Sequence, residues 1–177
     1  MKLPAPATWS RRIALAAAAA ALVAAGTGAG LALADRDDPA GVAERRAEVA
    51  ARGAEVMPFD LDRTTHVFTQ RPDGGVQVVT ADDPGDAVQV RLVREHLSEE
   101  AEAFARGDFG DPASIHGDDM PGLAALQAGA DRITVTYEDL PAGGQLTYTT
   151  GDAALVEALH AWFDAQVSDH GSHAEHG

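Results

Sequence analysis

The segment TTHVFTQRPDGGVQVVTA (residues 64–81) decides the fold that this sequence predicts. Its first six residues alternate in the way that a half-buried strand does. The pair Gly74-Gly75 marks a tight turn, because glycine adopts the backbone conformations that such turns require. Residues 76–81 continue as a second strand, so the segment predicts a β-hairpin.

A long helix is expected directly after this hairpin. Asp82, Asp83 and Pro84 supply the cap and first turn of a helix over about residues 86–105. Apolar side chains recur there every three or four residues, as in a helix with one face in the core. They are Val90, Val93, Leu97, Ala101 and Phe104.

The second half of the chain repeats this order. Residues 132–138 and 145–150 predict another hairpin, and a helix follows from Asp152. The turns at residues 72–75 and 141–144 share a P-x-G-G pattern, which suggests an internal duplication. The predicted fold is therefore α+β, ββα-ββα, with a four-stranded antiparallel sheet and two long helices on one face.

The N-terminus has the features of an export signal. Residues 1–12 are basic, residues 13–34 are uncharged, and Ala32-Leu33-Ala34 is a small-x-small end. We expect a signal peptide cleaved before Asp35 or, alternatively, an uncleaved membrane anchor, since about 20 apolar residues can span a bilayer. Either way the acidic part is exported across the cytoplasmic membrane, to be secreted, periplasmic or tethered by the transmembrane segment.

The exported part divides into three regions by composition. Residues 35–57 are rich in Ala, Arg and Glu and predict a linker or loose helical stalk. Residues 58–168 predict the compact α+β domain, and residues 169–177 predict a flexible, His-rich tail.

Charge and cysteine content exclude several classes of protein. The chain has 13 Lys+Arg, 28 Asp+Glu, 7 His and no Cys, for a net charge of −15. A chain this acidic repels phosphate backbones, so we expect no nucleic-acid partner. Without cysteine there is no disulfide, thiolate metal site or thiol nucleophile.

The Gly-, Asp- and Pro-rich loop over residues 106–120 contains the first candidate metal ligands. Long irregular loops within compact domains are often functional. His116 and Met120 combine an imidazole with a thioether, the pair that suits copper and above all Cu(I). In the alternative interpretation, Met120 fills the core beside Pro121 and His116 caps the loop.

Further histidines lie on the predicted helices and strands. His96 and His160 sit at the edges of the apolar stripes of the two long helices, where they could share a ligand or simply be half-buried. His66, on the first strand, could complete a site or face water. The tail histidines have a spacing that binds Ni, Cu or Zn readily, and they are His170, His173 and His176.

The sequence gives little support to an enzyme. It has no G-x-S-x-G elbow, no P-loop and no H-E-x-x-H motif. Glu95, Glu99 and Glu100, near Arg91 and Arg94, are typical of a solvated helix face with i,i+4 ion pairs. We therefore lean against catalysis.

Several short motifs resemble those of a family of small uncharacterised bacterial proteins, over about residues 57–171. They are REHL (residues 94–97), GDF and DP (107–112), IHG (115–117), MPGL (120–123), HAWFDAQ (160–166) and DHG (169–171). Some members are labelled aspartate carbamoyltransferase. This chain has neither the Ser-Thr-Arg-Thr phosphate loop nor the His-Pro-x-Gln motif of that enzyme, so we do not transfer the activity.

The leading hypothesis is a small extracytoplasmic metal-binding protein that handles or senses a metal, with copper favoured. His96, His116 and Met120 would be the ordered ligands, with His160 or His66 as a fourth and the tail histidines as a recruiting arm. Two alternatives stay open. One is a metal-free protein-interaction module of the cell envelope, and the other is an enzyme of unknown reaction that acts on a small molecule.

Overall fold

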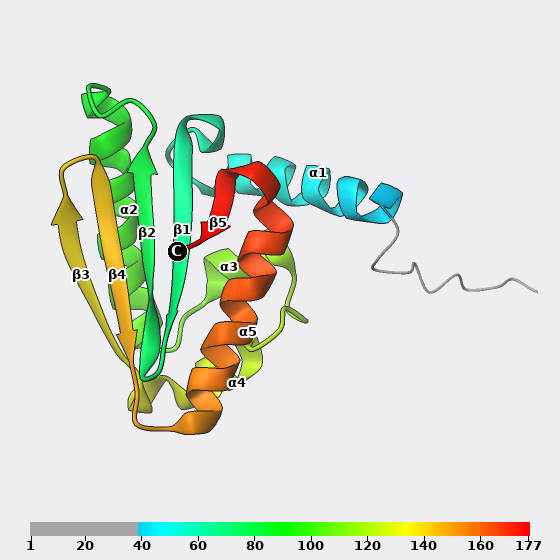
Figure 1. Ribbon diagram of the computed structural model, residues 1–177, viewed down its shortest axis with the longest axis vertical. Helices are drawn as coiled ribbons and strands as arrows, with labels where there is room; N and C mark the ends of the chain where they lie inside the picture. Colours follow the sequence, from blue (N-terminus) through cyan, green and yellow to red (C-terminus); the bar gives the residue numbers. More distant parts are fainter. Residues whose placement is uncertain (1–38) are drawn as a thin grey trace, which may run out of the picture. The chain divides into compact units, whose positions relative to one another are not determined.

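The computed structural model describes residues 39–177, which form five helices and five strands (Figure 1). The helices are α1 (Pro39–Val56), α2 (Ala87–Ala105), α3 (Gly110–His116), α4 (Leu123–Gly129) and α5 (Ala153–His170). The strands are β1 (Thr64–Arg71), β2 (Gly74–Ala81), β3 (Thr134–Leu140), β4 (Gly143–Thr149) and β5 (Ala174–His176). Short 3-10 helices occupy Leu61–Arg63, Ala130–Arg132 and Gly171–His173.

The strands make one mixed sheet in the order β3-β4-β2-β1-β5. The two predicted hairpins pair as β1 with β2 and β3 with β4, and β2 joins β4 antiparallel. The α+β class is therefore confirmed. The expected four-stranded antiparallel sheet is corrected to five strands, because β5 adds to the edge of β1 in the parallel direction.

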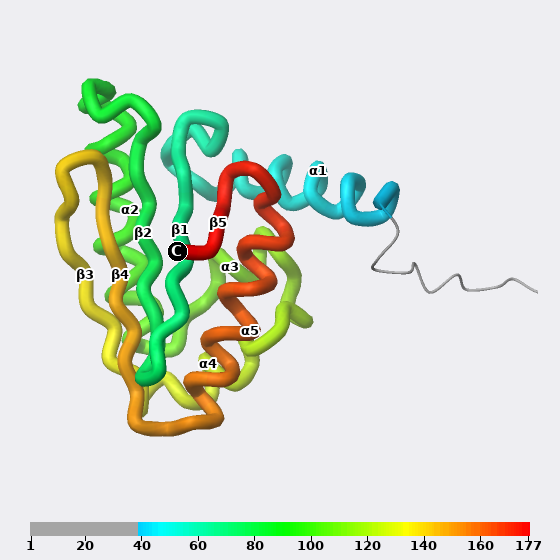
Figure 2. Tube along the Cα trace, in the orientation of Figure 1, coloured from blue at the N-terminus to red at the C-terminus, as the bar shows by residue number. Residues whose placement is uncertain are grey.

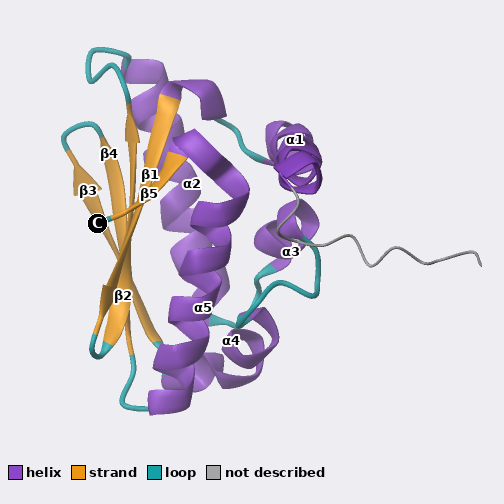
Figure 3. Ribbon diagram, turned by 45° about the vertical axis from the view of Figure 1, so that its right-hand side comes forward, coloured by secondary structure: helices purple, strands orange, loops and turns teal. Residues whose placement is uncertain are grey.

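Helices α2 and α5 both cover the same face of this sheet, and α1, α3 and α4 lie on that side as well (Figure 3). Each long helix begins at an aspartate, Asp86 or Asp152, whose carboxylate accepts hydrogen bonds from the first backbone N–H groups. Between sheet and helices lies an aromatic core. Its members are Phe68, Phe104, Phe109, Tyr148, Trp162 and Phe163.

The region expected to be a linker or stalk forms helix α1, which packs against α3 and α5. Val49 is fully buried in that contact. Arg52 donates a hydrogen bond to the Ile115 carbonyl oxygen at 2.6 Å, and Arg46 donates one to the Ser168 carbonyl oxygen at 2.9 Å. Because long arginine side chains reach backbone acceptors of both helices, a segment without aromatic residues still docks on the domain.

The C-terminal residues, expected to be a flexible tail, lie along β1 (Figure 2). Gly171 has a φ of 59°, a positive value that glycine adopts without strain, and it ends α5. Ala174 is buried, and the Gly177 N–H donates to the Phe68 carbonyl oxygen at 3.1 Å. Three residues are too few to show a strand pattern, so the sequence did not reveal this pairing.

The expectation of a membrane-spanning segment is corrected. Throughout residues 39–177, every helix is too short or too polar to cross a membrane. Residues 1–34, for which a signal peptide or anchor was expected, lie outside the described residues.

A substitution at Gly122 measures how tightly the segment before α4 packs on α5. Its φ is 78°, and a Cβ atom there would lie 2.0 Å from the Ala158 carbonyl oxygen. We expect Gly122→Ala to lower the free energy of unfolding by about 3 kcal/mol, since left-handed strain and overlap with backbone add. Urea denaturation measures this.

Gly151→Ala is the matched control, because a Cβ atom at that position meets nothing within 4 Å. We expect a change of about 0.5 kcal/mol or less. Equal effects of the two substitutions would contradict the packing described for Gly122.

Candidate metal centre

Four of the seven histidines line one small cavity between the sheet and the helices. Its volume is about 40 Å³, which is room for about three water molecules or a metal ion with bound water. The histidines come from four different elements, β1, α2, α3 and α5. They are His66, His96, His116 and His170.

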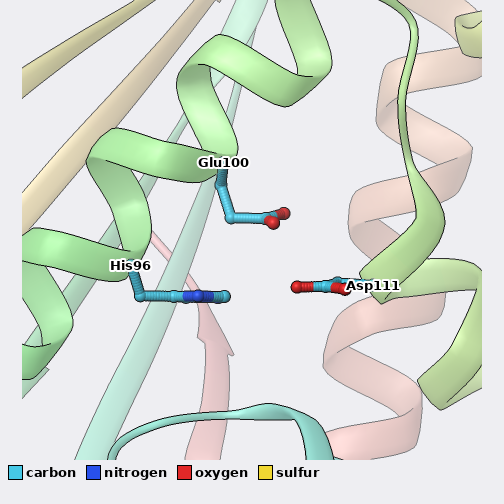
Figure 4. Close-up of side chains that lie close together, drawn as sticks. All are labelled: His96, Glu100 and Asp111. Carbon is cyan, nitrogen blue, oxygen red and sulfur yellow. The ribbon is translucent and has the colours of Figure 1, made fainter.

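Beside this cavity, His96, Glu100 and Asp111 point toward one another (Figure 4). His96 and Glu100 stand one turn apart on α2, and Asp111 lies in the first turn of α3. One ligand atom from each lies within 4.8 Å of the other two. Ligands of an ion with bonds of about 2.1 Å lie roughly 3–4 Å apart, so small side-chain rotations would bring these three atoms onto one ion.

The protonation states of this cluster follow from burial. Burial, together with the charge and hydrogen bond of Asp111, raises the pKa of Glu100 to about 8. Glu100 is therefore protonated at neutral pH. Burial also lowers the pKa of His96, so its imidazole is neutral and has a lone pair for a metal.

His116, which also lines the cavity, is held in place by a buried carboxylate. Its Nδ1 lies 2.9 Å from Asp169 Oδ2, and Arg45 binds both oxygens of Asp169 at 2.6 and 2.7 Å. Burial alone would raise the pKa of Asp169, but the hydrogen bonds from His116 and Arg45 outweigh it and hold this pKa at about 2. Because the ionised carboxylate only accepts, His116 donates its Nδ1–H and presents Nε2 for other chemistry.

His66 and His170 stack on each other, with ring centroids 5.4 Å apart, and His170 meets the His116 ring edge-on at 4.9 Å. Burial and the neighbouring imidazoles lower the pKa of His66 to about 3 and that of His170 to about 4. Both rings are therefore neutral at neutral pH. Neutral imidazoles can accept a metal or a hydrogen bond where protonated ones cannot.

The remaining predicted ligands lie apart from this cavity. Met120 is 4% exposed, packs in the core and lines a separate hollow beside α1. His160 donates from Nε2 to the Arg71 and Gly74 carbonyl oxygens at 3.0 and 2.9 Å, so it ties α5 to the first hairpin. His173 lies near Asp62 and His176 near Asp164, at 3.6 and 3.9 Å on the surface.

Sequence reasoning missed three acidic members of the site, Glu100, Asp111 and Asp169. Glu100 was expected on a solvated helix face, yet only 9% of it is exposed. The spacing of His96 and Glu100, four residues apart on a helix, was a usable signal. Asp111 and Asp169 had none, because tertiary packing alone brings Asp111 beside Glu100 and Asp169 beside His116.

Comparisons of the chain with protein-family models, with curated proteins and with solved structures gave no match. The likeness to a family of small bacterial proteins therefore stays a prediction.

The raised pKa of Glu100 makes the stability of the metal-free protein depend on pH. Between its ordinary value of 4.5 and about 8, the folded state holds a proton that the unfolded state releases. The free energy of unfolding should therefore fall as pH rises, by about 1 kcal/mol from pH 7 to pH 8. His66, His96 and His170 contribute little above pH 7, because burial lowers their pKa values and an unfolded imidazole is largely neutral there.

Urea denaturation of chelator-treated protein at the two pH values measures this fall. Glu100→Gln should remove it, whereas the exposed Glu95→Gln should leave it unchanged. A fall of the same size in Glu100→Gln would contradict the assignment.

Proposed function

We propose that this chain binds a divalent transition-metal ion through His96, Glu100 and Asp111, and that it handles or senses this metal rather than acting as a catalyst. The observation that supports the proposal is the approach of three ligand atoms to within 4.8 Å of one another beside a cavity. Two of the three residues, His96 and Glu100, are buried.

The carboxyl pair gives the first argument. Two ionised carboxylates in contact repel each other, and burial adds to the cost, so a bound proton keeps them together in the metal-free state. A divalent cation can replace that proton and neutralise both Glu100 and Asp111. An acidic pair with one buried and one half-buried member, next to a neutral imidazole, is therefore suited to a cation.

The donor set narrows the choice of metal. One imidazole nitrogen and two carboxylate oxygens suit Zn²⁺, Co²⁺ or Cu²⁺. Met120 lies elsewhere, so the thioether that favours Cu⁺ does not join these ligands. We therefore keep copper as a candidate in its Cu²⁺ form, beside zinc.

Residues around the cluster make the kind of hydrogen bond that usually orients the histidines of metal sites. His116 is oriented by Asp169 in the same way that carboxylates orient metal-binding histidines. It lines the same cavity as His96. An ordered arrangement of this kind selects among metals better than a surface cluster does.

The volume of the cavity supports the non-catalytic role. At about 40 Å³ it is far smaller than pockets that enclose organic substrates. We therefore propose metal handling or sensing, and we place it outside the cytoplasm on the basis of the sequence of residues 1–34.

Metal binding can be measured on the untagged full chain after chelator treatment. Every protein in this experiment should carry the substitutions His173→Ala and His176→Ala, because exposed histidines bind metals on their own and would hide binding at the proposed site. We expect one equivalent of Zn²⁺ or Cu²⁺ by mass spectrometry. Glu100→Gln and Asp111→Asn should each weaken the affinity tenfold or more in calorimetric titration, since each removes a charged ligand.

Glu99→Gln is the matched control, because Glu99 is exposed on the same helix one residue from Glu100. It should bind metal as the parent chain does. If Glu100→Gln and Asp111→Asn also bind as the parent does, the proposed site is wrong.

A further inference from the structure

Two nitrogen atoms at the cavity have no hydrogen-bond partner. They are His66 Nε2 and Trp162 Nε1. Within residues 39–177, these are the buried side-chain polar atoms that have no hydrogen-bond partner. Both side chains line the cavity, with exposed fractions of 6% and 1%. A buried polar group without a partner is costly, so such a pair at one cavity calls for an explanation.

Neither ring can easily turn to find a partner elsewhere. Trp162 is held edge-on by aromatic rings whose centroids lie about 6 Å away, those of Phe104, Phe109 and Tyr148. His66 is stacked on His170 and flanked by Phe59 at 6.1 Å. The partner therefore has to come from within the cavity.

The proposed metal site leaves room for such a partner. Three protein ligands leave at least one coordination position open on an ion of this type. Of the three, His96 and Glu100 themselves line the cavity that His66 and Trp162 line. A molecule bound to the ion from the cavity side therefore occupies the cavity that the two side chains with unpaired nitrogens also line.

We propose that the cavity takes a small inorganic anion of about three heavy atoms, bound to the metal at one end and hydrogen-bonded to Trp162 and His66. This inference rests on the proposed metal site. The indole N–H only donates, so the ligand has to accept a hydrogen bond. His66 Nε2 also donates in one of its two neutral tautomers.

Size and charge agree with a ligand of this class. About 40 Å³ holds about three water molecules, which matches a linear triatomic ion such as azide. A divalent ion and the carboxylates of Glu100 and Asp111 sum to zero charge. An incoming anion therefore does not meet a net negative charge from the ligands, in spite of the acidic chain.

Azide titration of the Co²⁺-loaded full chain tests the proposal, because Co²⁺ bands in the visible spectrum report its ligands. We expect azide to shift these bands saturably as it displaces metal-bound water. Trp162→Phe and His66→Leu should each weaken azide binding about tenfold, the effect of one lost buried hydrogen bond. Co²⁺ affinity should change less than threefold in either variant.

Tyr137→Phe is the control, since it also removes a polar atom from an aromatic ring, but on β3 and away from the cavity. It should bind azide normally. Retained Co²⁺ affinity shows that a variant is folded. If Trp162→Phe does not fold, His66→Leu still tests the proposal.

The outcomes separate this inference from the proposed function. Co²⁺ that binds but does not respond to azide would overturn the inference and leave the metal site standing. Azide binding of normal strength in Trp162→Phe or His66→Leu would overturn the role of these two side chains. A chain that binds no Co²⁺ would overturn both proposals.

Discussion

The buried carboxylate of Asp169 joins three helices, and the geometry of the site depends on it. From α5 it accepts hydrogen bonds from Arg45 on α1 and from His116 on α3. The last residue of α3 is thereby tied to α1 and α5, while its first turn carries Asp111 toward α2. Because α3 has only seven residues, this polar contact adds to the packing of the buried Pro112 and Ile115 in holding the helix in place.

The polar side chains around the cavity lower the free energy of unfolding. Glu100, His66 and His96 are all 9% exposed or less, and their ordinary ionised forms are disfavoured there. A core built for stability alone would place apolar side chains at these positions. Such violations of the usual burial pattern concentrate at functional sites, and the aromatic core next to the cavity offsets their cost.

Sequence patterns predicted the elements that have a strong period and a marked turn. Both hairpins and both long helices were of this kind, and the α+β class followed from them. Helix α1 has no aromatic residue and was expected to be a stalk, α3 lies in a Gly- and Asp-rich stretch expected to be a loop, and β5 has three residues. These three depend on contacts with distant residues, which no local pattern records.

For the site, the sequence by itself determined the local placements: His66 on a strand face, and His96 and His160 on amphipathic helices. The tertiary structure alone decided which of them meet. His66, His116 and His170 come together because β1, α3 and α5 meet at one cavity, whereas His160, in the middle of α5, bonds to a hairpin turn. A helix repeats every 3.6 residues, so its pattern tells which face is buried, but only packing tells which side chains lie opposite that face.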